Sequence, residues 1–403
     1  MRSCTLISQR GSRISVLATI LVVTLTGCRQ DAQSPTAPEP TALATASSAP
    51  LLFRQISAGN NHTCGVTMDD LAYCWGFNWA GQVGDGTTTD RFQPVAVAGD
   101  LRFLEVTTGL DHSCGVTLEN RAYCWGRNDR GQLGNGEFEN LPTPAAVAGG
   151  HRFRQVSAGS VHTCAITRAD LAWCWGSNGV GQLGDGNPGT NRATPVRVLR
   201  GLYWRQISAG NSHTCAASTG YRAYCWGQNR DGQLGDGTTF QRSQPTLIAR
   251  KLVIRHVAAG GVHSCAVSTA NLAYCWGFNG EGALGIGTRS KRLTPAAVIG
   301  QRTWSQLSAG ISHTCGLTLS QRAWCWGDNL AGQLGDGTDT DRLRPVLVGD
   351  GMPFRQVTAG SLFSCGVSRL RPGYCWGSNT AGQLGVTARG NYLEPVAIMA
   401  PAD

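Results

Sequence analysis

The chain has 403 residues, of which 54 are glycine and only 15% are charged. Many glycines and few charges favour a protein of tight turns with few exposed helices, which is typical of an all-β fold. The formal net charge is +9, and almost all of the positive charge is arginine. Because these arginines are spread along the whole sequence rather than clustered, they do not indicate a nucleic-acid-binding patch.

The first 28 residues resemble a bacterial lipoprotein signal peptide. Three arginines precede an apolar stretch at 14–26, which is shorter than the roughly 20 residues that a membrane span needs. The stretch ends in Leu25-Thr26-Gly27-Cys28, which resembles a lipobox. We therefore expect residues 1–28 to be a signal peptide ending at a lipidated Cys28. A secretory signal with an incidental cysteine is the alternative.

Residues 29–50 are rich in Ala, Pro, Ser and Thr. Such a composition buries too little apolar surface to offset the entropy of folding. We expect this segment to be a disordered linker between the lipidated cysteine and the rest of the chain.

From residue 51 to residue 400 the sequence consists of seven repeats of about fifty residues. Each repeat contains four segments of strand length separated by Gly or Asp turns, and in the first repeat these are 53–58, 62–67, 71–75 and 94–98. Four strands per repeat and seven repeats predict an all-β fold, a seven-bladed β-propeller of four-stranded antiparallel blades. A linear β-solenoid is the alternative, but it needs distinct end caps, for which the sequence shows no candidates.

Each repeat contains Trp-Gly-x-Asn-x-x-Gly-Gln-Leu-Gly or a close variant, first at 75–84 and last at 376–385. This pattern resembles the regulator of chromosome condensation repeat family, and the resemblance covers residues 51–400. It implies the seven-bladed propeller of that family. The founding member promotes nucleotide exchange on a small GTPase, but we do not expect this activity here, because an exported protein would not meet GTP.

Fourteen cysteines form seven pairs with a constant spacing of ten residues, and each pair flanks a tight turn. A hairpin about that turn places the two cysteines opposite each other, at a Cα separation that suits a disulfide. A zinc site made from His-x-Cys and the second cysteine is the alternative, but it offers three ligands per repeat where a structural site needs four, and the seventh repeat has Phe363 instead of histidine. We expect one disulfide per blade, formed outside the cytosol. The expected pairs are Cys64 with Cys74, Cys114 with Cys124, Cys164 with Cys174, Cys215 with Cys225, Cys265 with Cys275, Cys315 with Cys325 and Cys365 with Cys375.

The other repeated residues have structural interpretations. We expect the histidines two residues before the first cysteine to be hydrogen-bonded packing residues and the Trp-Gly tryptophans to fill the space between blades. The asparagines after Trp-Gly are expected to bond loop backbone. The Gly-Asp-Gly-Thr loops lack the lysine and helix of a phosphate loop. The arginines expected to brace these loops are Arg91, Arg192, Arg242, Arg292 and Arg342.

Residues that differ between repeats are the candidates for function. They precede each repeated histidine or follow each Trp-Gly. If they lie on loops, they form a surface of mixed aromatic and charged character, as found at protein interfaces. The candidate binding residues are Phe77, Trp79, Arg127, Arg130, Arg230, Phe278 and Asp328.

These features together predict a non-enzymatic, protein-binding propeller that is exported and lipid-anchored to the bacterial cell envelope, at the periplasmic face of the outer membrane or on the cell surface. No catalytic residue, metal ligand or cofactor is expected. The expected partner is an envelope or extracellular protein. Membrane contact is expected through the lipid anchor only, nucleic acid is not an expected ligand, and the protein is expected to be a monomer. The alternatives are carbohydrate or cell-wall binding, with Trp79 and Phe278 as candidates, and an enzyme with a site at the channel mouth.

Overall fold

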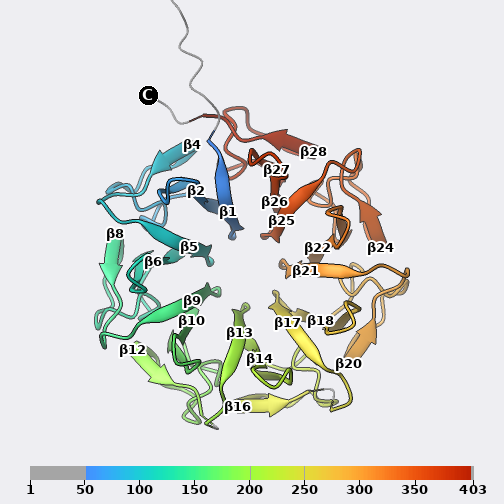
Figure 1. Cartoon of the computed structure of the whole chain (residues 1–403), viewed down its shortest axis with the longest axis horizontal. Coiled ribbons are helices and arrows are strands. Elements are labelled where there is room, and N and C mark those ends of the chain that lie inside the picture. The colour runs from blue at the N-terminus through green and yellow to red at the C-terminus, as the bar shows by residue number, and fades with distance from the viewer. Residues whose placement is uncertain (1–50, 200, 249, 401–403) are drawn as a thin grey trace, which may run out of the picture. The chain divides into compact units, whose positions relative to one another are not determined.

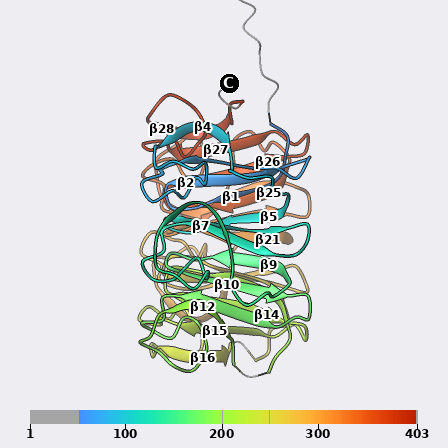
Figure 2. The ribbon, with the colours of Figure 1, turned by 90° about the vertical axis from the view of Figure 1, so that its left-hand side faces the viewer.

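The structure, a computed structural model, describes residues 51–199, 201–248 and 250–400. The predicted signal peptide 1–28, the predicted lipidation site Cys28 and the predicted linker 29–50 lie outside the described residues. Seven four-stranded antiparallel sheets surround a central channel, and each sheet is built from one repeat with its strands in chain order (Figure 1). Figure 2 shows the ring from the side, with the blades from β1 to β16 following one another in chain order from top to bottom. The predicted seven-bladed propeller is confirmed.

Each blade has an innermost strand that faces the channel and a second strand paired with it. The innermost strands are β1 (Phe53–Ala58), β5 (Phe103–Thr108), β9 (Phe153–Ala158), β13 (Trp204–Ala209), β17 (Ile254–Ala259), β21 (Trp304–Ala309) and β25 (Phe354–Ala359). The second strands are β2 (His62–Thr67), β6 (His112–Thr117), β10 (His162–Thr167), β14 (His213–Ser218), β18 (His263–Ser268), β22 (His313–Thr318) and β26 (Phe363–Ser368).

A third strand and an outermost strand complete each blade toward the rim of the ring (Figure 1). The third strands are β3 (Ala72–Gly76), β7 (Ala122–Gly126), β11 (Ala172–Gly176), β15 (Ala223–Gly227), β19 (Ala273–Gly277), β23 (Ala323–Gly327) and β27 (Gly373–Ser378). The outermost strands are β4 (Arg91–Ala96), β8 (Leu141–Ala146), β12 (Arg192–Arg197), β16 (Arg242–Leu247), β20 (Arg292–Ala297), β24 (Arg342–Leu347) and β28 (Asn391–Ala397).

Packing between neighbouring blades explains why the strands show so little polar and apolar alternation. Every residue of β2 is buried, because both faces of the second strand contact other blades. The outermost strand β4 is mostly half-buried and carries Pro94. Proline has no N–H to donate, and an edge strand is where a sheet tolerates that loss.

The predicted strands of the first repeat agree with the structure except at the outer edge. The first two segments have the predicted bounds, and the third is shifted by one residue. The fourth runs over Arg91–Ala96 rather than 94–98, because Arg91 pairs with Gly76 across an irregularity in the ladder. This irregularity brings the residues before Pro94 into the strand, which a pattern centred on the proline does not predict.

Tryptophans of the third strands pack and hydrogen-bond against the preceding blade. Trp125 is fully buried, and its indole Nε1 donates a hydrogen bond to the carbonyl oxygen of Gln82 in the preceding blade, at 3.0 Å. It packs with Val83 of that blade and with Phe103 of its own. The same donor bond recurs at every junction from Trp75 to Trp376. The tryptophans therefore fill the space between blades, as predicted.

One disulfide joins the second and third strands of each blade. Cys64 and Cys74 lie directly opposite in the ladder with their Cα atoms 4.1 Å apart, and the other six pairs have the same arrangement. These six are Cys114 with Cys124, Cys164 with Cys174, Cys215 with Cys225, Cys265 with Cys275, Cys315 with Cys325 and Cys365 with Cys375. All seven predicted pairs are confirmed. The zinc alternative is excluded at these positions, because both sulfurs are already bonded to each other.

The ring closes between the last blade and the first without exchange of strands. Gln356 of blade 7 donates to the carbonyl oxygen of Ile56 at 3.0 Å and accepts a hydrogen bond from its N–H at 2.9 Å. The N–H of Ser361 donates to the carbonyl oxygen of Gly59 at 3.1 Å. Closure is therefore non-covalent and joins whole repeats.

Candidate functional site

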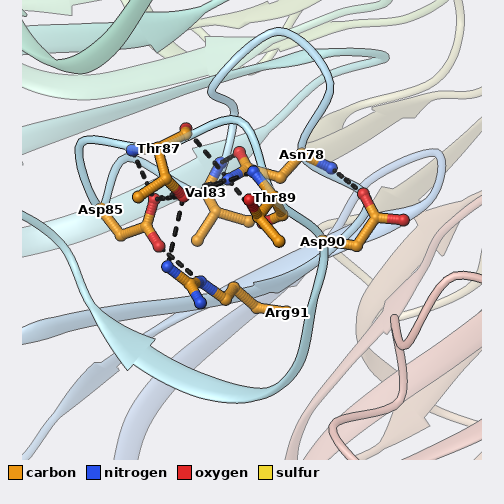
Figure 3. Close-up of polar contacts among 7 residues, drawn as sticks. All are labelled: Asn78, Val83, Asp85, Thr87, Thr89, Asp90 and Arg91. Atoms are coloured by element: carbon orange, nitrogen blue, oxygen red, sulfur yellow. Dashed lines mark hydrogen bonds and ion pairs between the residues drawn. The ribbon is translucent and has the colours of Figure 1, made fainter.

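The long loop between the third and outermost strands, called the outer loop here, is held together from within (Figure 3). In blade 1 the amide nitrogen Nδ2 of Asn78 donates to the carbonyl oxygens of Thr87 and Thr89, at 3.1 and 3.0 Å. Its Oδ1 accepts a hydrogen bond from the N–H of Val83 at 2.9 Å. The repeated asparagine thus bonds loop backbone, as predicted, and it is buried and closed to ligands.

An aspartate and an arginine close the same loop. Arg91 Nε lies 2.6 Å from Asp85 Oδ2. Burial alone would raise the pKa of Asp85, but hydrogen bonds from Thr87 and Arg91 outweigh it and lower the pKa. The pair recurs as Asp185–Arg192, Asp236–Arg242 and Asp336–Arg342.

The fifth blade departs from this pattern. Ile286 replaces the aspartate there, and Arg292 forms no ion pair with any residue that the structure describes. The prediction that arginines brace the outer loops is thus confirmed for four of five and wrong for Arg292. Arg292 does not brace its loop because blade 5 has no carboxylate at the position of Ile286.

The repeated histidines link each blade to the next. His62 is fully buried, and its Nε2 lies 2.9 Å from Ser113 Oγ of blade 2. Burial lowers the pKa of His62 to about 3, so the ring is neutral. Five more histidines make the same contact with a Ser or Thr of the following blade. They are packing residues, as predicted.

The channel wall carries a ring of side chains that the sequence analysis did not single out. One residue from the middle of each innermost strand lines a cavity of about 320 Å³. In five blades this residue is glutamine, and Gln55 is typical: its Nε2 donates to the carbonyl oxygen of Val106 at 2.8 Å, and its Oε1 accepts from the N–H of Val106 at 3.0 Å. Each such glutamine therefore ties its strand to the backbone of the next blade.

Two blades break the ring of glutamines. Glu105 accepts a hydrogen bond from the N–H of Val156 at 2.6 Å, and burial raises its pKa to about 7. His256 occupies the position in blade 5, where burial lowers its pKa to about 4 and its Nδ1 has no hydrogen-bond partner among the described residues. Sequence comparison of the repeats could have found both residues, because the other five repeats have glutamine at this position.

Glycines narrow one mouth of the channel. A Cβ atom on Gly109 would clash with the carbonyl oxygen of Gly159, so the strands meet backbone to backbone. The corners of all seven blades, Ala-Gly in six of them and Thr108-Gly109 in blade 2, line a cavity of about 110 Å³ at this mouth. The residues that follow the corner glycines, among them Asn60, Asn211 and Ile311, also line this cavity.

Three of the predicted binding residues meet beside this mouth, between blades 1 and 2. The guanidinium carbon of Arg127 lies 5.9 Å from the ring centroid of Trp79, which is 48% exposed. Arg127 also pairs with Asp129 at 2.7 Å and with the largely buried Asp111 at 3.5 Å. Arg130 adjoins them through Asp129 at 3.7 Å. These five residues are called the mouth cluster here. Asp111 and Asp129 lie at the variable positions predicted to carry function, but they were not on the shorter list of candidate binding residues.

The remaining predicted candidates do not join the mouth cluster. Arg230 is exposed on blade 4, and Phe77 and Phe278 are half-buried. Asp328 is buried, and its carboxylate accepts a hydrogen bond from the N–H of Leu330 at 3.2 Å within its own loop. It therefore presents little surface to a partner.

Residues 51–199, 201–248 and 250–400 contain no group of three or more His, Cys, Asp or Glu side chains that could hold a metal ion. The same residues contain no helix long and apolar enough to cross a membrane.

Comparisons with known proteins agree with this geometry. The RCC1-like domain profile matches residues 146–402, and profiles of the regulator of chromosome condensation (RCC1) repeat match residues 69–116 and 119–166, and 53–82 and 104–132. No curated protein sequence matches the chain.

Several solved structures share the fold. Human WBSCR16 is 22% identical with a TM-score of 0.70, over 77% of this chain and 84% of that one. Yeast RCC1 (Prp20), solved bound to Kap60, is 17% identical with a TM-score of 0.73, over 92% and 91%. The CRINKLY WD40 ectodomain of the Arabidopsis thaliana receptor kinase ACR4 is 20% identical with a TM-score of 0.53, over 85% and 99%. The domain match extends over more than half of the chain and agrees with seven observed blades, so this chain belongs to the RCC1-like domain family.

Proposed function

We propose that this protein is an exported, monomeric propeller that binds another protein and is held at the bacterial cell envelope by a lipid on Cys28. The seven disulfides support export, because such bonds form and persist in oxidising compartments. The lipobox-like sequence ending at Cys28 and the Pro/Ala/Ser/Thr-rich segment 29–50 support a tethered form.

The mouth cluster is the observation that carries the proposal of protein binding. It combines a half-exposed tryptophan with an arginine fixed by two carboxylates, and these two residue types dominate the energy of protein interfaces. Because Asp111 and Asp129 hold Arg127 in place, little side-chain entropy would be lost on binding.

Two similar structures support this proposal at the level of the fold. Yeast RCC1 was solved bound to another protein, Kap60, and ACR4 carries its propeller in an ectodomain. Neither identity is high enough to transfer a partner to this chain. We propose that the partner is an envelope or extracellular protein and that the propeller performs no catalysis.

Carbohydrate binding is the second candidate, because the exposed face of Trp79 could stack on a sugar ring. Phe278, the other aromatic residue considered for this role, is half-buried and lies in blade 5, so it cannot form one platform with Trp79. A single exposed aromatic favours protein binding over a sugar platform.

Crosslinking on intact cells followed by affinity purification tests the proposal. The wild-type protein should retain one envelope protein, and a double variant with Trp79→Ala and Arg127→Ala should lose it. The matched control combines Phe240→Ala with Arg344→Ala, which removes an exposed aromatic and an exposed arginine elsewhere on the ring. Retention on peptidoglycan or glycans without a protein partner would overturn the proposal in favour of the second candidate.

Anchoring is tested separately by metabolic labelling with radioactive palmitate. The wild-type protein should be labelled and a Cys28→Ser variant should not. Unlabelled wild-type protein would reject the lipid anchor and leave the binding proposal intact.

The disulfides, which support export, are tested by a count of free thiols. In the denatured, unreduced protein this count should include none of the fourteen propeller cysteines.

A further inference from the structure

One face of the propeller, called the hairpin face here, is formed by three kinds of segment. These are the turns between the second and third strands, the first residues of the innermost strands, and the linkers that lead into the innermost strands. These segments touch one another: the N–H of Phe103 donates to the carbonyl oxygen of Asp70 at 2.8 Å, and the N–H of Leu118 to that of Arg102 at 3.0 Å. The face comprises turns 68–71, 118–121, 168–171, 219–222, 269–272, 319–322 and 369–372, strand positions 54, 104, 154, 205, 255, 305 and 355, and the linkers 51–52, 98–102, 148–152, 201–203, 250–253, 299–303 and 349–353.

The hairpin face concentrates the positive charge of the propeller. It carries 16 Arg or Lys and six Asp or Glu, whereas the rest of the described chain carries 13 Arg or Lys and 16 Asp or Glu. Ion pairs among the described residues neutralise only two of these cations, Arg54 with Asp70 and Arg154 with Asp170. In other blades the position of Asp70 is Tyr221, Asn271 or Arg371, so the neighbouring arginines keep their charge uncompensated.

The same face also gathers exposed apolar side chains. Ten of the nineteen large apolar side chains that are exposed in the described residues lie on it. At the turns, Met68, Leu118, Leu319 and Leu370 project from blades 1, 2, 6 and 7, which are neighbours in the closed ring, and Leu370 is 82% exposed.

The chain enters the propeller on this face, in the middle of the apolar turns. Leu52 bridges to Pro372 in the turn of blade 7, and the N–H of Phe53 donates to the carbonyl oxygen of Arg371 at 3.0 Å. The segment that leads to Cys28 is therefore joined to the propeller where these turns lie. A chain tethered to a bilayer through that segment would have its point of attachment on the hairpin face.

We propose that the hairpin face docks on a bilayer rich in anionic phospholipid, with its arginines and lysines at the headgroups and its apolar turns at the acyl boundary. Basic residues combined with exposed apolar side chains are the recognised means of peripheral membrane binding. This adds a second, non-covalent contact to the lipid anchor expected from the sequence. It also directs the mouth cluster, at the other end of the innermost strands, away from the membrane and toward a partner.

Vesicle co-sedimentation tests this inference with the chain from Arg29 to Asp403, secreted without Cys28 so that no lipid is attached. This chain retains the complete ring, because every closure contact lies within residues 51–400. Vesicles of phosphatidylcholine with added phosphatidylglycerol should bind it, and vesicles of phosphatidylcholine alone should not. Salt should weaken the binding, because it screens the headgroup attraction.

Charge reversal shows which face binds. The triple variant with Arg168→Glu, Lys251→Glu and Arg369→Glu should weaken binding to anionic vesicles by about a hundredfold, since each basic residue at such a surface contributes about a fivefold increase in affinity. The matched control combines Arg197→Glu, Lys291→Glu and Arg344→Glu, which changes the net charge equally at exposed sites outside the hairpin face and should retain binding. Circular dichroism of both variants checks that the ring remains folded.

The contribution of the apolar turns is tested with the double variant Leu319→Gln and Leu370→Gln, which should weaken vesicle binding at high salt. The control is the double variant Leu330→Gln and Phe240→Gln, which changes exposed apolar side chains outside the hairpin face and should retain binding. Equal effects of both charge variants, or no binding to anionic vesicles, would overturn the inference. Binding to duplex DNA with no binding to vesicles would do the same and would assign the face to nucleic acid. Because neither the partner nor lipidation of Cys28 enters these measurements, failure here leaves the proposed function untouched.

Discussion

At the scale of single residues, Glu105 shows how one departure from a repeat changes the chemistry of a position. Glutamines at this position donate with Nε2 and accept with Oε1, as Gln55 does with Val106. An ionised carboxylate can only accept, so Glu105 in that form can bond the N–H of Val156 but cannot donate to a carbonyl oxygen as the glutamines do. A protonated Glu105 restores the missing donor, which agrees with its raised pKa.

We predict that Glu105→Gln stabilises the propeller at pH 8 by about 3 kcal/mol and has little effect at pH 4. The pKa of Glu105 is about 7 in the folded state against an ordinary 4.5. Between these values the folded state holds a proton that the unfolded state has lost, so the free energy of unfolding falls as pH rises through this window. The glutamine variant should lack that fall. Urea denaturation at both pH values measures the difference.

The reverse change supplies the control. Gln155→Glu places a carboxylate at the same position in the next blade and should destabilise the ring at pH 8 more than at pH 4. His256 and the buried histidines titrate in both proteins of each comparison, so their contribution cancels. Equal gains at pH 4 and pH 8 for Glu105→Gln would assign its effect to packing rather than to the proton.

Single residues were also where sequence reasoning was least complete. It selected positions by their variability and so found Trp79 and Arg127, which do meet. It also selected Asp328, whose carboxylate turns back to its own loop. Sequence variability identifies a loop position but not the direction of its side chain, because that direction depends on which backbone N–H groups lie nearby.

At the scale of the structural element, the outer loop depends on the pairing of one carboxylate with one arginine. The Asp336 side chain is 7% exposed and lies 2.7 Å from Arg342 Nε. Removal of the arginine would leave a buried carboxylate with fewer partners, which is costly even where the pair itself adds little net stability. In blade 5, Arg292 has no such carboxylate to leave behind.

We therefore predict that Arg342→Ala lowers the free energy of unfolding by about 1–2 kcal/mol, whereas Arg292→Ala changes it by less than about 0.5 kcal/mol. The two arginines occupy equivalent positions at the start of β24 and β20, so the comparison isolates the carboxylate. Urea midpoints measure stability, and hydrogen exchange of residues 328–341 shows whether the loss is local. Equal losses for the two variants would mean that the arginines act through packing of their aliphatic stems.

Strands and hairpins could be predicted because each element is repeated seven times with the same turn chemistry. The cysteine spacing of ten residues was enough to place both partners opposite each other in a hairpin, from Cys64 and Cys74 in blade 1 to Cys365 and Cys375 in blade 7. The outermost strand was displaced in the prediction because its register depends on an irregularity between Cys74 and Gly76, which has no residue signature of its own.

At the scale of the whole molecule, the sevenfold repeat predicts a ring, but the repeat does not contain the information that decides how the ring closes. The repeats make nearly the same contacts to their neighbours, so closure by whole repeats and closure by strand exchange fit the pattern equally well. The distribution of charge between the two faces was hidden for a related reason. The arginines are evenly spaced along the chain, and only the alternating strand direction brings sixteen basic residues to one face.

The closing junction should be the weakest point of the ring, because six junctions also have a chain linker and the seventh has only non-covalent contacts. A Cβ on Gly360 would lie 2.5 Å from the carbonyl oxygen of Gly59 and 2.7 Å from the Phe363 ring. We predict that Gly360→Ala destabilises the propeller by about 1–3 kcal/mol, since the backbone must move apart to accept the methyl group.

Two comparisons make this prediction specific to closure. Gly109→Ala creates a similar clash with Gly159 at a junction that a linker holds, so it should lower the unfolding midpoint without exposing chain ends. Gly179→Ala meets no heavy atom within 4 Å and should change stability by less than about 0.5 kcal/mol. Limited proteolysis under native conditions should cut Gly360→Ala first within blades 1 and 7, because these blades open together once the junction is strained. If proteolysis of Gly360→Ala began at the outer loops of the middle blades, the non-covalent junction would not be the point at which the ring opens.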